Sequence, residues 1–297
     1  MKRGFYIKFI LGLLFCITIS CKKKDSNNNN DVSATEYDIA KSYDLTDIAY
    51  GGDSKQKMDV YLPANRDGNS TKVFVLIHGG GWTAGDKSDY ASTVAALKTY
   101  YPNHAIINLN YRLGSQGNPG YPKQINDIQA ALNEIQKEKY NLAKKYLLYG
   151  GSAGGHLSLL YGYAFDPNHY VKGIVNTVGP ADLTDTSVTK SVFLMGVVGG
   201  LLGDAVNNYQ ANQSLFVEAS PAKQVTVNSP PTISFYGDQD PLIPVTQMPL
   251  LRAALQSKGV WHYDTIYPGA GHGVWASQAQ NQDYINMTMS FINQFFN

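Results

Sequence analysis

The strongest constraint on the fold is a series of short apolar segments that end in glycine and alternate with segments of helical periodicity. The runs "KVFVLIHGGG", "KKYLLYG" and "PTISFYG" are typical of strands that are buried on both faces of a parallel sheet. Between them, one segment repeats apolar residues at helical spacing, at Ile125, Ile128, Leu132 and Ile135. This alternation predicts an α/β fold, with a mostly parallel twisted sheet of about eight strands and helices on both faces.

The chain length favours one large domain, which we place at 37–297. With 297 residues, 43% of them hydrophobic, the chain can bury one sizeable core. "YDLTDIAYG" and "KMDVYLP" predict a hairpin at its start. The segment at about 184–225 is too long for a simple connection and predicts a small helical insertion. The insertion either lies beside the strand ends, where it covers a site or forms its wall, or packs on the sheet edge with a purely structural role.

The first 36 residues have the composition of a leader. A basic start, "MKRGFYIKF", precedes the apolar run "ILGLLFCITIS", which is too short to span a membrane and is typical of a secretion signal. Cys21 follows directly after the small residue Ser20. We therefore predict a lipoprotein signal peptide at 1–20 and lipidation of Cys21, with palmitate among the attached acyl groups. An ordinary cleaved signal peptide is the alternative. The polar stretch at 21–36 predicts a flexible tether.

This leader predicts an extracytoplasmic protein that is lipid-anchored through Cys21 to a bacterial (outer) membrane, on its periplasmic or cell-surface face. Both cysteines lie in the leader, so we expect no disulfide in the domain. Without the leader's Lys2, Arg3 and Lys8, 21 basic residues stand against 23 acidic ones. No basic stripe is present, so nucleic acid is not an expected partner.

The sequence around Ser152 predicts a nucleophile. Gly150-x-Ser152-x-Gly154 lies between a strand-like "KYLLY" and a helix-like "HLSLLY", and a strand that turns at once into a helix forces its central residue into strained backbone angles. The residues on either side come close together and must be small, as the two glycines are. The alternative is a glycine-rich turn without chemistry.

The segment "HGGGW" predicts an oxyanion-binding loop. It ends the "VFVLI" strand, and glycines let backbone N–H groups approach a substrate closely. We assign the oxyanion donors to the N–H groups of Gly80, Gly81 and Ala153. A phosphate loop is the alternative, but the segment lacks both G-x-G-x-x-G spacing and a Lys-Ser/Thr pair. His78 is expected to orient the loop.

A serine nucleophile needs a base, and the base needs a carboxylate that orients it. "TISFYGDQDPLIP" ends a strand and offers two candidates, of which we assign Asp240 to the carboxylate role and expect Asp238 to shape the turn. "DTIYPGAGHGV" ends the next strand and offers His272 as the base. Of the other histidines, His156 is expected in the helix after Ser152, with a packing or hydrogen-bonding role.

These motifs resemble the α/β-hydrolase superfamily, and in particular its "HGGGW" carboxylesterases. The resemblance runs from about residue 43 to the C-terminus through "KMDVYLP", "HGGGWTAGDK", "NYRLG", "GGSAGGHLS", "FYGDQDPLIP" and "GAGHG". It is similar to the feruloyl and acetylxylan esterase group and, more distantly, to hormone-sensitive-lipase-like esterases. The glycine-rich "YRLGSQGNPGYP" departs from the "YRLAPE" of the latter, so the acyl pocket is not implied by that group. The resemblance implies the same catalytic residues: Ser152, Asp240 and His272, with Gly80, Gly81 and Ala153 as oxyanion donors.

The predicted function is hydrolysis of carboxylic esters through a Ser-His-Asp triad and an acyl-enzyme. Short-chain esters, or acetyl and feruloyl esters on polysaccharides, are the expected substrates. No cofactor and no metal is expected, because the sequence shows no metal-ligand spacing. The alternatives are a prolyl-oligopeptidase-like peptidase, an arylformamidase, and a non-catalytic glycan-binding lipoprotein with the same fold.

Overall fold

The computed structural model of the chain describes residues 36–297. The predicted signal peptide at 1–20, the predicted lipidation site Cys21 and all but the last residue of the predicted tether at 21–36 lie outside the described residues. Within residues 36–297, no helix has both the length and the apolar character needed to cross a membrane.

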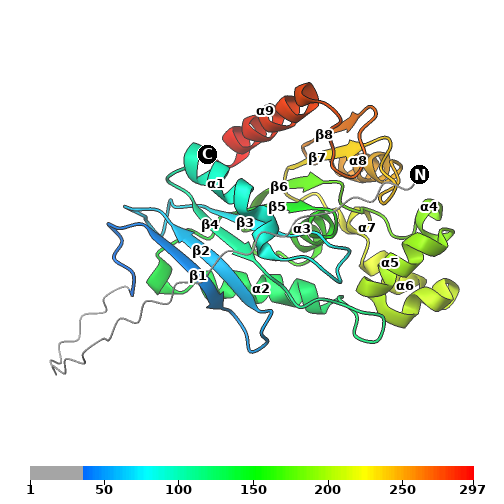
Figure 1. The fold of residues 1–297 in the computed structure, drawn as a ribbon, viewed down its shortest axis with the longest axis horizontal. Helices are drawn as coiled ribbons and strands as arrows, with labels where there is room; N and C mark the ends of the chain where they lie inside the picture. The colour runs from blue at the N-terminus through cyan, green and yellow to red at the C-terminus, as the bar shows by residue number, and fades with distance from the viewer. Residues whose placement is uncertain (1–35) are drawn as a thin grey trace, which may run out of the picture. The chain divides into compact units, whose positions relative to one another are not determined.

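One sheet of eight strands organises the described part of the chain, in the order β1-β2-β4-β3-β5-β6-β7-β8 (Figure 1). β1 and β2 form the predicted hairpin, β2 also pairs antiparallel with β4, and the remaining pairs are parallel. The mostly parallel sheet is therefore confirmed. The strands are β1 (Tyr43–Ala49), β2 (Lys57–Leu62), β3 (Val73–Ile77), β4 (Ala105–Leu109), β5 (Tyr146–Gly151), β6 (Val171–Thr177), β7 (Thr232–Gly237) and β8 (His262–Tyr267).

Helices cover both faces of the sheet, as the alternating pattern predicts. Residues of α1 and α9 pack in one hydrophobic cluster, and residues of α2 and α3 pack in another (Figure 1). The elements around the sheet are η1 (Lys87–Tyr90), α1 (Ala91–Tyr100), α2 (Lys123–Ile135), η2 (Glu138–Tyr140), α3 (Ala153–Ala164), α8 (Gln247–Ser257) and α9 (Gln278–Phe295).

Successive side chains of the central strands point to opposite faces of the sheet and so belong alternately to the two clusters. In β3, Val73, Val75 and Ile77 enter the cluster with α2 and α3, whereas Phe74 and Leu76 enter the cluster with α1 and α9. This is the period-two pattern of a strand covered on both faces. On the helical side, the apolar residues that predicted α2 are all buried, at Ile125, Ile128, Leu132 and Ile135.

The insertion lies between β6 and β7 and is helical. Its elements are α4 (Thr186–Thr189), α5 (Val192–Leu202), η3 (Gly203–Ala211), α6 (Gln213–Glu218) and α7 (Pro221–Gln224). The loops that follow β3, β5, β7 and β8 leave the same edge of the parallel sheet, where the carboxyl ends of the strands meet. Ligand sites in open parallel sheets form at this edge.

Candidate active site

Ser152 sits at a strained turn between β5 and α3. Its φ of 54° and ψ of −124° fall in a region that non-glycine residues rarely adopt. Its N–H donates to the Thr177 carbonyl at 2.8 Å, so strand β6 helps to hold the turn. Strain of this kind, at a position that lines a cavity, is typical of a functional residue.

The glycines around Ser152 are required by close backbone contacts. A Cβ on Gly150 would lie 2.2 Å from the Gly154 carbonyl oxygen, and a Cβ on Gly154 would lie 1.9 Å from the Ile77 carbonyl oxygen. Both distances are far below van der Waals contact, so the turn cannot form with any larger residue at either position. The sharp turn leaves Ala153 as the first residue of α3, where the N–H groups and the positive end of the helix dipole favour an anion.

The loop after β3 turns its backbone with three consecutive positive φ angles, at Gly80, Gly81 and Trp82. The Gly80 carbonyl accepts hydrogen bonds from the N–H groups of Thr83 and Ala84, which closes the loop tightly. Within residues 36–297, the N–H groups of Gly80 and Gly81 donate to no protein acceptor. Both glycines border the same cavity as Ser152 and Ala153. Unpaired donors beside a strained serine are what an oxyanion site needs.

His78 contacts the backbone of this loop and helps to hold its conformation. Its ring is buried and stacks on Tyr111 with centroids 4.2 Å apart, and its Nδ1 lies 2.7 Å from the Gly79 carbonyl oxygen. The Tyr111 hydroxyl donates to the His78 carbonyl at 2.8 Å. Burial lowers the pKa of His78. The orienting role predicted for His78 agrees with this geometry.

Asp240 and His272 are brought together from the loops after β7 and β8. His272 Nδ1 donates to Asp240 Oδ2 at 2.8 Å, while Asp240 Oδ1 accepts the N–H groups of Leu242 at 2.8 Å and Ile243 at 3.0 Å. The Asp240 side chain is 1% exposed and that of His272 is 29% exposed. Burial acts to raise the pKa of Asp240, but the hydrogen bonds from His272 and the two N–H groups outweigh it and lower that pKa. The carboxylate is therefore ionised beside the imidazole.

Asp238, the other carboxylate of this loop, has a different contact. Its Oδ1 accepts the N–H of Gly269 at 2.7 Å, which ties the loop after β7 to the loop after β8. Asp238 therefore shapes the turn, as expected from the sequence.

A cavity of about 1100 Å³ joins these groups. Its wall includes Ser152 and His272, although no hydrogen bond joins the two side chains in the described part of the chain. Catalytic contacts of this kind often tighten only when substrate is bound. The insertion supplies another wall through four apolar residues of α5: Val192, Phe193, Leu194 and Val197. Of the two placements considered for the insertion, the one beside the site is therefore correct for α5.

Residues 58–255, two thirds of the chain, match the protein family described as BD-FAE. The chain belongs to the BD-FAE family. The match includes Gly80, Gly81, Ser152, Ala153 and Asp240 but ends before His272. The assignment of His272 therefore depends on its bond to Asp240 and on its place in the cavity wall.

Curated relatives of this BD-FAE chain are similar at 26% identity. Esterase LipC of Mycobacterium tuberculosis matches over 76% of this chain and 59% of its own length, and the probable carboxylic ester hydrolase LipM of the same organism over 68% and 49%. Dipeptidyl aminopeptidase BIII of Pseudoxanthomonas mexicana matches over 78% of this chain and 34% of its own length. The chain thus spans between about a third and three fifths of the length of these relatives.

Two solved structures show that the BD-FAE chain has the α/β-hydrolase fold. A truncated form of a carbohydrate esterase from gut microbiota superposes with a TM-score of 0.68 at 21% identity, covering 87% of this chain and 98% of that one. The acetyl ester-xyloside bifunctional hydrolase from Caldicellulosiruptor lactoaceticus gives a TM-score of 0.64 at 20% identity, covering 80% and 88%.

His156 of the BD-FAE chain supports the glycine-rich loop after β3. The Trp82 indole N–H donates to His156 Nδ1 at 3.2 Å, and His156 Nε2 lies 2.8 Å from the Ala219 carbonyl oxygen, to which it donates. His156 thus links the loop after β3 to the insertion. The sequence predicted a packing or hydrogen-bonding role for His156 but not its partners, because both contacts join residues more than sixty positions apart.

The buried His156 predicts a loss of stability in acid. Burial lowers its pKa to about 4, whereas an unfolded histidine has a pKa of about 6.5. Above pH 6.5 the group is neutral in both states, and below that value the unfolded chain binds a proton that the folded chain does not. The free energy of unfolding therefore falls as the pH falls from 6.5 towards 4, by roughly 2 to 3 kcal/mol at pH 4.5.

Urea unfolding at pH 7 and at pH 4.5 measures this effect. In His156→Gln, the difference in unfolding free energy between the two pH values should shrink by the stated amount. His169→Asn, in an exposed loop, should leave that difference unchanged. Equal pH dependence in wild type and His156→Gln would show that His156 does not carry the effect.

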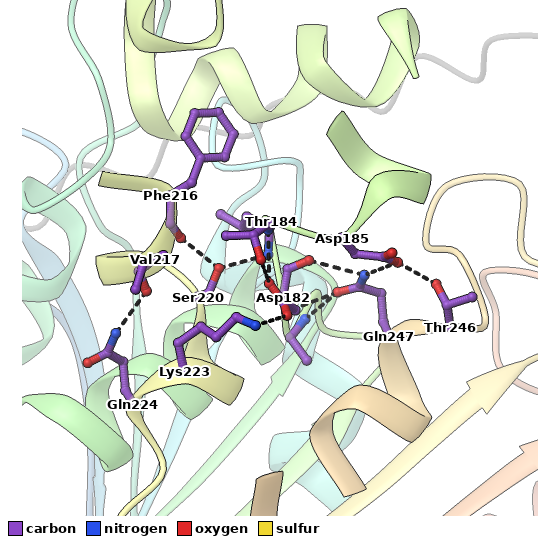
Figure 2. Close-up of polar contacts among 12 residues, drawn as sticks. Asp182, Thr184, Asp185, Phe216, Val217, Ser220, Lys223, Gln224, Thr246 and Gln247 are labelled. Atoms are coloured by element: carbon purple, nitrogen blue, oxygen red, sulfur yellow. Dashed lines mark hydrogen bonds and ion pairs between the residues drawn. The ribbon is translucent and has the colours of Figure 1, made fainter. Parts of the chain in front are cut away.

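A network of hydrogen bonds that was not predicted from the sequence joins the insertion to α8 (Figure 2). At its centre, the buried Gln247 accepts the N–H groups of Ala181 and Asp182 at 2.8 Å and donates to Asp185 Oδ2 at 3.2 Å. Asp182 pairs with Lys223 of α7 at 2.9 Å. A signal was present in the sequence: Gln247 shares a helical face with Leu251 and Leu255, so a polar group there had to be buried.

Proposed function

We propose that this protein is a serine esterase that hydrolyses carboxylic esters through Ser152, His272 and Asp240. The observation that carries the proposal is that a strained serine, an imidazole bonded to a buried carboxylate and two unpaired N–H groups border one cavity. The names of the relatives LipC and LipM, an esterase and a probable carboxylic ester hydrolase, support the reaction class.

The first half of the proposed reaction transfers the acyl group to the enzyme. Ser152 Oγ attacks the ester carbonyl carbon while His272 Nε2 takes the hydroxyl proton. The negative oxygen that forms is stabilised by the N–H groups of Gly80, Gly81 and Ala153. The bond to the alcohol then breaks, and His272 gives its proton to the leaving oxygen.

The second half releases the acid. Water attacks the acyl-enzyme carbonyl as His272 takes a proton from it, and the same N–H groups stabilise the second oxyanion. The bond to Ser152 Oγ breaks, the serine regains the proton from His272, and the free acid leaves. Asp240 fixes the imidazole with its proton on Nδ1 and stabilises the cation formed in each half.

We propose short-chain esters, or acetyl and feruloyl esters on polysaccharides, as the substrate class. The cavity of about 1100 Å³ is large enough to admit a sizeable substrate beside the serine. The carbohydrate esterase and the acetyl ester-xyloside hydrolase with the same fold support this choice. A lipid tether at Cys21, which stays a prediction from the sequence, would hold such an enzyme near extracellular glycans.

A peptidase is the second candidate, because dipeptidyl aminopeptidase BIII matches at the same identity as the esterases. That protein is about three times as long as the part that this chain matches. The two candidates differ in the bond that is cleaved, so substrate choice separates them.

A fluorophosphonate probe followed by a substrate panel tests the proposal. The probe should label the wild-type chain on the peptide that contains Ser152. In the panel, acetyl, butyryl, octanoyl and feruloyl esters and acetylated xylan are compared with a dipeptidyl anilide, and an ester should be turned over fastest. Faster cleavage of the anilide would favour the peptidase, and absence of both labelling and turnover would contradict any hydrolase.

A further inference from the structure

A second cavity, of about 510 Å³, opens next to the reaction cavity. Its walls come from α1, from α9 and from the loop that follows His272. Helices α1 and α9 cover the same face of the sheet, although they lie almost two hundred residues apart in the sequence (Figure 1). The roles assigned so far to Ser152, Asp240 and His272 do not use this space.

The lining of this second cavity is aromatic and uncharged. Tyr100 and Trp275 present exposed rings, with 58% and 42% of their surfaces accessible. None of the residues that line the cavity is acidic, basic or histidine. A ligand of this cavity should therefore be neutral and should have at least one flat, apolar face for the rings to contact.

Polar groups are also available in the lining. Ser92 and Thr93 contribute hydroxyl groups to the lining, and Asn281 contributes an amide. None of these three residues is buried, so their polar groups are open to a ligand. The ligand should therefore carry hydroxyl groups as well as apolar faces.

The second cavity meets the reaction cavity close to His272. Tyr90, Gly151 and Thr177 border both cavities. His272 borders the reaction cavity, and the next residue, Gly273, borders the second one. His272 gives its proton to the leaving alcohol in the proposed reaction, so that alcohol lies close to His272, and the second cavity is lined by the residue that follows it. The apolar residues of α5 line the reaction cavity but not the second one, and they suit the acyl group.

We propose that the second cavity binds a neutral sugar ring in the alcohol part of the ester. A pyranose has C–H faces that fit Tyr100 and Trp275 and hydroxyl groups that can pair with Ser92, Thr93 and Asn281. The proposal rests on the esterase activity proposed above. An aliphatic acyl chain is the competing occupant, but it would form no hydrogen bond with Ser92, Thr93 or Asn281.

Two substrates that have the same acetyl group but different alcohols show how the alcohol part of the ester affects the rate. Ethyl acetate and an acetylated xylobiose are both assayed by released acetate, and the ratio of their kcat/KM values is the readout. Ala96→Arg places a bulky side chain in the cavity from an exposed position of α1, and Ala95→Arg places the same residue at an exposed position outside it. Ala96→Arg should lower kcat/KM for acetylated xylobiose relative to ethyl acetate roughly tenfold, and Ala95→Arg should not.

A second pair of variants removes a contact instead of blocking the space. Tyr100→Ala should lower the same ratio roughly fivefold, whereas Tyr263→Ala, at an exposed tyrosine outside the cavity, should leave it unchanged. An unchanged ratio in both Ala96→Arg and Tyr100→Ala would overturn the sugar subsite. A selective loss on octanoyl esters would overturn it in favour of an acyl chain. Absence of turnover of both acetyl esters by the wild type would instead count against the esterase itself.

Discussion

Replacing Ser152 by alanine should lower kcat for p-nitrophenyl acetate by about four to six orders of magnitude. Without Oγ no acyl-enzyme can form, and no other hydroxyl in this cavity sits on a strained turn beside a helix N-terminus. The N–H groups of Gly80, Gly81 and Ala153 remain, so a small rate above the uncatalysed one should persist. Alanine has the same backbone limits as serine, so the strained turn should fold as before.

Ser158→Ala is the matched control for this change. Ser158 lies on the same helix and donates to the Gly154 carbonyl at 2.7 Å, but it does not line the reaction cavity. Its variant should keep kcat within about threefold of wild type, with a modest loss in melting temperature. If Ser152→Ala kept more than about 1% of wild-type kcat, the nucleophile would have to be another residue.

The turn at Ser152 could be predicted because its causes are local. Gly150, Ser152 and Gly154 are two residues apart, and the backbone contacts that demand glycine are set within one strand-to-helix turn and by the adjacent strand β3. The same holds for the loop at Gly80 and Gly81, whose positive φ angles only glycine adopts without strain. Where sequence and geometry are linked over a few residues, the sequence predicted both the position and the conformation.

Contacts between distant segments could not be predicted in the same way. The bond between Trp82 and His156 and the network around Gln247 join loops and helices that only the finished fold brings together. The second cavity depends on how closely α1 and α9 pack, which no local pattern specifies. His104 illustrates the limit: it lies in the loop after α1, yet it is half-buried against the rings of Phe74 and Phe296, which are distant in the sequence.

Replacing Asp240 by asparagine should lower kcat by about three to four orders of magnitude while leaving the fold intact. Two backbone N–H groups, from Leu242 and Ile243, donate to Oδ1 of Asp240. In the variant only the amide oxygen can occupy that place, so the amide NH₂ must face His272 Nδ1 from the position of Oδ2. His272 Nδ1 then has to accept, and its proton moves to Nε2, the nitrogen that should take the proton of Ser152.

Asp238→Asn separates this effect from a general change in the loop. Asp238 stands two residues away, and its Oδ1 accepts only the Gly269 N–H, a bond that an asparagine oxygen can replace. Its kcat should stay within about threefold of wild type. Activity of both variants on p-nitrophenyl acetate, with melting curves to verify folding, gives the comparison. Equal losses in the two variants would mean that the loop geometry, and not the tautomer of His272, carries the effect. Because the backbone donors to Oδ1 leave the amide one orientation, a fully active Asp240→Asn would also contradict the role of His272 as the base.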